Sequence, residues 1–155
     1  MTQSRLHGTC VMLAFPAGQA GVIFTGPPGS GKSDLALRLI DSGARLVADD
    51  QIVIEARGGR LFAQAPEAIR GRIEVRGVGV VAVPFAAEVE VRLQIALGRE
   101  GARLPEPAFA ALAGVRVPQL LLNAFEASAA AKVRLALLAL MVPPSPGVTF
   151  PFAPE

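Results

Sequence analysis

The chain contains the octapeptide Gly26-Pro27-Pro28-Gly29-Ser30-Gly31-Lys32-Ser33 between an apolar run and an amphipathic one. It matches the pattern G-x-x-x-x-G-K-[ST] of phosphate-binding loops without a mismatch. Residues 21–25 before it predict a buried strand, and residues 34–40 after it predict a helix. Strand, loop and helix in that order form the context in which this pattern binds phosphate. We therefore expect all eight residues to contact a nucleotide or another polyphosphate.

Each part of the octapeptide has a physical use in holding phosphate. The glycines let backbone N–H groups turn inward around phosphate oxygens, and the following helix points its positive end at the same anion. Lys32 adds a positive charge near the outer phosphates, and the Ser33 hydroxyl suits a Mg²⁺ ion. The alternative is a glycine-rich turn that binds nothing, and the flanking strand and helix argue against it.

The composition describes an apolar chain of one domain. Of its 155 residues, 52% are hydrophobic and 18% are charged, which is enough for a sizeable core. No uncharged run reaches the ~18 residues of a membrane span, and the polar start lacks a secretory signal. The single cysteine, Cys10, excludes an internal disulfide framework. These features predict a cytoplasmic protein that does not associate with a membrane.

The charge pattern argues against nucleic acid as a partner. The net charge is +2, the arginines are scattered along the chain, and Trp and Tyr are absent. A nucleic-acid surface needs a basic stripe or stacking rings, and neither is visible in the sequence. The mild positive balance is better suited to phosphate ligands or an acidic protein partner.

Periodicity predicts many strands and two helices. Strands are expected over residues 7–15, 21–25, 45–48, 51–55, 60–64, 72–83 in two pieces, 89–97 and 115–122. One helix follows the octapeptide to about Asp41, and another covers residues 128–140 with Ser128 as its N-cap. Residues 98–114 are polar and contain prolines, which is typical of a loop. The fold class is therefore α/β with a mixed, strand-rich sheet over residues 1–142, followed by a proline-rich irregular tail over 143–155.

Acidic residues follow the predicted strand 45–48 directly. Asp49 and Asp50 stand at its carboxyl end, and the strand can return beside the loop strand so that both ends share one edge of the sheet. An aspartate there can hold Mg²⁺, directly or through water, or accept a proton from an attacking hydroxyl. The structural alternative is an acidic turn that caps the strand. Glu74, within a strand, faces either solvent or a site. A lone histidine such as His7 is usually structural or solvated, so His7 by itself favours that interpretation over a functional one.

Taken together, these motifs resemble the catalytic domain of the HPr kinase/phosphorylase family, in a short form without the N-terminal domain. The resemblance is strong over residues 7–83 and weaker to residue 142. Residues 73–80 look like the family's signature segment, usually Leu-Glu-Ile-Arg-Gly-Leu-Gly-Ile. The other matching pieces are His7-Gly8, the octapeptide, Arg45-Leu46-Val47-Ala48-Asp49-Asp50 and Arg103-Leu104-Pro105.

The resemblance implies a phosphoenolpyruvate-carboxykinase-like P-loop kinase that phosphorylates a serine of the carrier protein HPr with ATP or pyrophosphate and Mg²⁺. It also implies the reverse reaction, phosphorolysis of seryl-phosphate HPr, and a hexameric assembly. Ser33 and Glu74 would bind Mg²⁺, and Asp50 would take the serine proton. His7 would belong to the phosphate site, and Arg103 would neutralise charge on the transferred group. Residues 122–128 replace the glycine- and arginine-rich stretch that the family has at this point. This departure weakens the expectation of phosphorylase activity more than the expectation of kinase activity.

Two other functions stay open at the level of the sequence. A small-molecule kinase of the shikimate or nucleoside-monophosphate type also places acidic residues after the loop helix, although it has fewer strands and more helices. A non-catalytic nucleotide-sensing module needs the phosphate-binding loop but has no need of Asp50.

Overall fold

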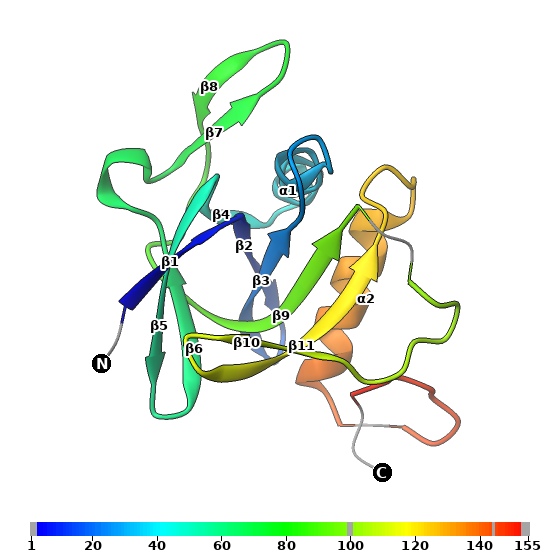
Figure 1. Ribbon diagram of the computed structural model, residues 1–155. Helices are drawn as coiled ribbons and strands as arrows, with labels where there is room; N and C mark the ends of the chain where they lie inside the picture. Colours follow the sequence, from blue (N-terminus) through cyan, green and yellow to red (C-terminus); the bar gives the residue numbers. More distant parts are fainter. Residues whose placement is uncertain (1–2, 99–100, 144, 153–155) are drawn as a thin grey trace.

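The computed structural model describes residues 3–98, 101–143 and 145–152, which form eleven strands and two α-helices (Figure 1). The helices are α1 (Lys32–Asp41) and α2 (Ala129–Met141), and a short 3-10 turn covers Glu67–Ile69. The strands are β1 (Gln3–His7), β2 (Thr9–Phe15), β3 (Gly18–Thr25), β4 (Arg45–Ala48), β5 (Gln51–Arg57), β6 (Arg60–Gln64), β7 (Arg72–Val75), β8 (Gly79–Ala82), β9 (Val89–Leu97), β10 (Phe109–Leu112) and β11 (Val115–Leu122).

Nine strands form one curled, mixed sheet, as the α/β prediction required. Its order is β1-β5-β6-β9-β3-β2-β4, with β11 also paired to β9 and β10 paired to β11. β9 is the strand at which the sheet curls, because its first residues pair with β6 and its last residues pair with β3 and β11. The remaining two strands, β7 and β8, form a separate hairpin that extends from the body of the molecule in Figure 1.

The two faces of the central strands bury different sets of side chains. One face packs against α1 and α2 in a cluster that includes Phe24, Leu35 and Leu137. The other face is covered by the curled strands β5 and β6, in a cluster that includes Cys10 and Ile52. Burial of large apolar side chains on both faces stabilises the central strands, and these strands position the candidate site.

Three expectations from the sequence need correction. The strand predicted over residues 7–15 is two strands, because the chain passes from β1 to β2 at Gly8. A Cβ at Gly8 would lie 2.7 Å from the Phe24 carbonyl oxygen, so only glycine allows this close approach. β10 forms inside the segment predicted as a loop, where it pairs with β11. Ser128 occupies the N-cap position of α2, but its side chain makes no capping hydrogen bond.

The strand before the two aspartates does not lie directly beside the loop strand. β2 lies between β4 and β3 and is antiparallel to both, so β3 and β4 run in the same direction. Their carboxyl ends therefore reach the same edge of the sheet, as expected. β9 is parallel to β3, and β11 is parallel to β9, so four strands end at this edge.

The segment after α2 returns to the body of the protein. Phe150 packs against the cluster that contains the helices, and the Phe152 ring meets the Phe109 ring edge to face, with centroids 5.5 Å apart. Among the described residues, no helix is both long and apolar enough to cross a lipid bilayer.

Candidate active site

The octapeptide connects β3 to α1 at the edge where the four strands end. α1 begins at Lys32, and Gly31 precedes it in a left-handed conformation with φ 94°. A Cβ at Gly31 would lie 2.8 Å from the Ala124 Cβ, so both its conformation and its surroundings require glycine. The Ser30 hydroxyl is buried and has no hydrogen-bond partner within the described structure. An unpartnered buried hydroxyl in such a loop suits an incoming phosphate oxygen.

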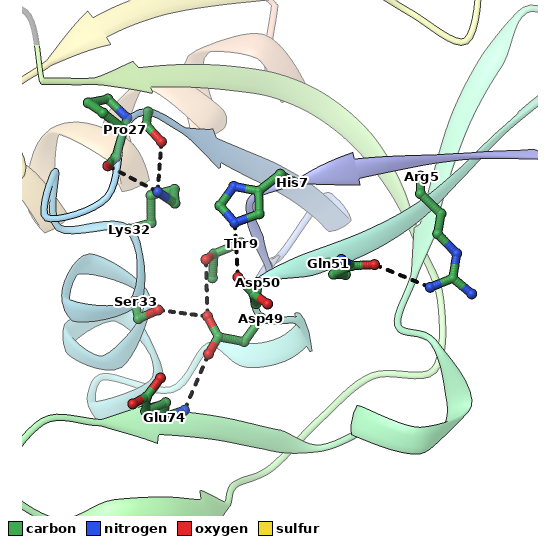
Figure 2. Close-up of polar contacts among 11 residues, drawn as sticks. Arg5, His7, Thr9, Pro27, Lys32, Ser33, Asp49, Asp50, Gln51 and Glu74 are labelled. Atoms are coloured by element: carbon green, nitrogen blue, oxygen red, sulfur yellow. Dashed lines mark hydrogen bonds and ion pairs between the residues drawn. The ribbon is translucent and has the colours of Figure 1, made fainter.

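Lys32 closes over the loop that precedes it. Its ammonium group donates hydrogen bonds to the carbonyl oxygens of Gly26, at 2.7 Å, and Pro27, at 3.2 Å (Figure 2). These bonds keep the positive charge at the mouth of the loop. A bound polyphosphate would find a cation already in place there.

The Asp49 carboxylate joins four elements of the fold. It is buried and accepts hydrogen bonds from the Ser33 hydroxyl at 2.7 Å, the Thr9 hydroxyl at 3.1 Å and the Glu74 backbone N–H at 3.2 Å. Figure 2 shows these contacts converging from α1, β2 and β7 on the residue that follows β4. Because the Ser33 hydrogen is directed to Asp49, the lone pairs of the Ser33 oxygen remain available for a cation.

The oxygen donors at this point fit a magnesium ion. Ser33 and Glu74 line the same cavity, and Asp49 bonds both residues. No group of three or more His, Cys, Asp or Glu side chains in the described part of the chain is arranged to hold a metal by itself. Mg²⁺ does not require one, because it commonly takes one or two carboxylates and completes its coordination with water and substrate phosphates.

Asp50 turns away from Asp49 and meets His7. Its oxygen Oδ1 lies 2.9 Å from His7 Nε2, and both side chains are exposed, at 71% for Asp50 and 59% for His7 (Figure 2). A carboxylate only accepts hydrogen bonds, so Nε2 carries the hydrogen of this contact. The Asp50 backbone is left-handed, with φ 73°, and its carbonyl oxygen accepts the Gly8 N–H at 3.0 Å. The turn thus presents an oriented carboxylate to solvent, one residue from the carboxylate that bonds Ser33.

A cavity of about 380 Å³ lies in front of α1. Besides the glycines of the loop and Lys32 and Ser33, its walls are formed by Asp34, Leu37, Glu74, Val75, Arg76 and Phe125. The phosphate-binding loop and the proposed metal-binding oxygens therefore open into one space of the size of a small-molecule site.

Comparison with known proteins identifies the family. Residues 1–111 match the model of the HPr Serine kinase C-terminal domain. The chain belongs to this family. HPr kinase/phosphorylases of Clostridium tetani and Clostridium beijerinckii are 43% identical over 82 residues and 41% identical over 81 residues. These stretches cover 53% and 52% of the chain and 26% of each relative, so the chain matches about a quarter of the length of these relatives.

The fold agrees with that family. The structure of the HPr(Ser) kinase/phosphatase from Coxiella burnetii superposes with a TM-score of 0.74 and 25% sequence identity. The match covers 87% of this chain and 94% of that one. The mixed, strand-rich α/β fold of an HPr kinase domain is therefore shown for this chain.

Arg103 lies apart from the other site residues predicted from the family resemblance. It lines a second cavity, of about 400 Å³, with Leu120, Glu126 and Lys132 rather than the cavity in front of α1. The structure therefore brings together the loop, Asp49, Asp50, His7 and Glu74 at one edge, and it does not bring Arg103 to them.

Five residues of the first cavity were not predicted as site residues, and Arg76 and Phe125 are two of them. Arg76 lies within the signature segment of the HPr kinase family, so that segment offered a signal for it. Phe125 lies in the stretch where the chain departs from the family. Phe125 lies beside Gly31, although the two residues are more than 90 positions apart in the chain. A local sequence pattern does not predict such a long-range contact.

Proposed function

We propose that this chain is the catalytic domain of a kinase that transfers a phosphoryl group from ATP or pyrophosphate to a serine of an HPr-like carrier protein. The observation that carries the proposal is the hydrogen bond between Ser33 and Asp49. This bond fixes the phosphate-binding loop beside Asp49. The next residue, Asp50, presents a carboxylate to solvent. Family membership and the names of the relatives supply the identity of the acceptor.

The loop would hold the phosphates of the donor. Its N–H groups and the Lys32 ammonium group would neutralise their negative charge, and the Ser30 hydroxyl would gain a partner. Ser33 and Glu74 would hold a magnesium ion, with Asp49 supporting both. When bound, that ion supplies positive charge to the phosphate oxygens and orients them for transfer.

Asp50 would act as the general base. The serine hydroxyl of HPr donates its proton to Asp50 while its oxygen forms a bond to the terminal phosphorus atom. The bond from phosphorus to the leaving phosphate breaks, and the proton remains on the Asp50 carboxyl group. His7 occupies one oxygen of Asp50 through Nε2, which orients the other oxygen for the incoming hydroxyl. General base catalysis of this kind contributes roughly 10²- to 10⁴-fold to a rate.

The same residues would serve the reverse reaction. Inorganic phosphate in the loop would attack the phosphorus atom of seryl-phosphate HPr and form pyrophosphate. Protonated Asp50 would return its proton to the departing serine oxygen, because microscopic reversibility requires one group to act as base and acid. We further propose that Arg103 neutralises charge on the transferred group, and that the protein acts in the cytoplasm as a homo-oligomer, hexameric as the resemblance implies.

A transfer assay tests this function. The protein is incubated with Mg²⁺, ATP labelled on the terminal phosphate and purified HPr, and label is sought on a serine of HPr by mass spectrometry. A parallel reaction replaces HPr with shikimate and nucleoside monophosphates. We expect label on HPr only. Label on a small molecule would indicate a small-molecule kinase, and tight ATP binding without any transfer would indicate a nucleotide-sensing module; either result would contradict the proposal.

A further inference from the structure

Phe125 is an exposed aromatic residue beside the phosphate-binding loop. The residue is 66% exposed, and its ring forms part of the wall of the cavity in front of α1. The ring also approaches the loop itself, because a Cβ placed on Gly31 would lie 3.2 Å from the Phe125 Cζ atom. A large apolar ring that faces a cavity next to an anion site is available to a ligand that continues beyond the phosphates.

The topology places Phe125 on the side of the loop opposite the aspartates. β3, β9 and β11 are parallel neighbours, and Leu97 of β9 is in register with Leu122 of β11. Phe125 follows the carboxyl end of β11, whereas Asp49 follows that of β4, which is separated from β3 by β2. The aspartates therefore lie on one flank of the loop, and Phe125 lies on the other. Ligands of α/β sheets bind across such carboxyl ends.

The Phe125 backbone is held in place by α1. Arg38 donates hydrogen bonds to the carbonyl oxygens of Ala124 and of Glu126, the latter at 3.3 Å, so it grips the residues on both sides of Phe125. Arg38 is itself held by Asp34, one turn earlier on α1, at 3.1 Å. The Phe125 N–H donates to the Asn123 side chain at 3.0 Å. Because α1 begins in the phosphate-binding loop, the ring has a defined position relative to the phosphates.

The cavity combines charged and polar groups with apolar side chains. Lys32 and Ser33 give its loop end a positive charge and a hydroxyl group. Leu37, Val75 and Phe125 supply apolar surface to the same cavity. Pyrophosphate has no apolar part to cover this surface, whereas a nucleoside triphosphate carries a flat aromatic base on the far side of its phosphates.

We propose that Phe125 is a donor-specificity residue: its ring stacks on the base of a nucleoside triphosphate, with Leu37 completing the apolar wall. The donor for which this cavity is shaped is then a nucleotide rather than pyrophosphate. The inference deepens the proposed function and rests on it only in taking the octapeptide as the site of the donor phosphates. Stacking between a base and an aromatic side chain is tolerant of base identity, because every base has a π-face.

Binding measurements on matched variants test the inference without depending on turnover. Isothermal titration calorimetry compares ATP and pyrophosphate, each with Mg²⁺, on the native chain, Phe125→Ala, Phe125→Trp and Leu135→Ala. Leu135 is a suitable control because it is equally exposed, at 66%, but lies on α2. We expect Phe125→Ala to weaken ATP binding roughly 5- to 150-fold, the range for loss of one stacking ring. Pyrophosphate affinity should stay the same, and Phe125→Trp should retain ATP binding.

Two results would overturn the inference. The first is unchanged ATP affinity in Phe125→Ala; if the KM for HPr is then raised, the ring belongs to the site of the protein substrate. The second is an equal loss of ATP and pyrophosphate affinity, which would indicate a disturbed loop rather than a lost base contact. Retained pyrophosphate binding also shows that the variant is folded.

Failure of this inference is distinguishable from failure of the proposed function. If Phe125→Ala loses affinity for ATP but not for pyrophosphate, and the native chain phosphorylates no HPr, the base contact is supported and the proposed function is wrong. If HPr is phosphorylated and Phe125→Ala binds ATP normally, the function stands and the base contact is wrong.

Discussion

The Ser33 hydroxyl donates a hydrogen bond to the Asp49 carboxylate over 2.7 Å, and this contact joins the phosphate-binding loop to the tip of β4. The two adjacent aspartates have different environments. Asp49 is buried and bonded by three donors, whereas Asp50 is exposed and paired with His7. In the proposed function, Asp49 would organise the binding site and Asp50 would meet the second substrate.

Asp49→Asn should destabilise the protein and weaken the magnesium-dependent part of ATP binding. An amide has one acceptor oxygen, so its NH₂ group must replace an oxygen that now faces Ser33, Thr9 or the Glu74 N–H. We expect a loss of about 1–3 kcal/mol in the free energy of unfolding, measured by urea denaturation. Asp41→Asn, exposed at the end of α1, is the control and should change stability by less than about 0.5 kcal/mol. Equal stability of the two variants would contradict the role of Asp49.

Lys32→Ala should abolish phosphoryl transfer, because it removes the cation at the mouth of the loop. The expected reduction in the rate of transfer from ATP is roughly 10²-fold or more. Lys132→Ala is a matched control, since Lys132 is the other lysine of the chain and pairs with Glu126 near the surface. Surface pairs contribute about 0–1 kcal/mol, so this variant should keep its activity. Normal turnover in Lys32→Ala would argue against the phosphate-binding assignment.

His7 and Asp50 should be coupled in the transfer step. A double-mutant cycle compares the single-turnover rates of His7→Ala, Asp50→Asn and the double variant. His7→Ala should slow the native chain but have little further effect once Asp50 is changed, which corresponds to a coupling of roughly 0.5–3 kcal/mol. Additive effects would mean that His7 does not act through its 2.9 Å contact with Asp50.

Arg103→Ala should lower turnover more than ATP affinity if Arg103 approaches the transferred group only during the reaction. The expected drop in kcat is about tenfold or more, with the Kd for ATP measured separately by calorimetry. Arg45→Ala, exposed at the amino end of β4, is the control. A change confined to ATP affinity would contradict the proposal, and the position of Arg103 in the second cavity makes this a demanding test.

Cys10 should give stability a pH dependence on the alkaline side. Burial raises the pKa of the Cys10 thiol above its ordinary value, whereas the unfolded thiol titrates near about 8.5. Its contribution is complete below about pH 8.5, and the free energy of unfolding should fall by about 1.4 kcal/mol per pH unit as the pH rises above that value. Urea denaturation between pH 8 and 10 measures the slope, and Cys10→Ala should remove it. If the free energy of unfolding depends on pH in the same way in both proteins, the prediction is wrong.

The sequence predicted the phosphate-binding loop and the acidic tip because both are local patterns. The octapeptide and the neighbouring periodicities depend on residues close in the chain, and the structure confirms the strand, loop and helix around them. The direction of β4 was also predicted, but the insertion of β2 beside it was not, since pairing order depends on distant strands.

What the sequence did not predict depends on long-range contacts. The break at Gly8 arises from the Phe24 carbonyl oxygen of another strand, and β10 forms because β11 offers it a partner. Phe125 reaches the loop through the hydrogen bonds that Arg38 makes to residues nearly 90 positions away. No pattern within either segment encodes such contacts, so the apolar side of the candidate site emerges only in the folded chain.

The most direct measurement is the single-turnover rate of phosphoryl transfer to HPr by the native chain and by Asp50→Asn, with both proteins saturated with ATP and Mg²⁺. Calorimetry first establishes that the two proteins bind ATP equally. We expect phosphoserine on HPr with the native chain and a rate roughly 10²- to 10⁴-fold lower with Asp50→Asn. Transfer at the native rate by Asp50→Asn, or unmodified HPr with the native chain, would contradict it.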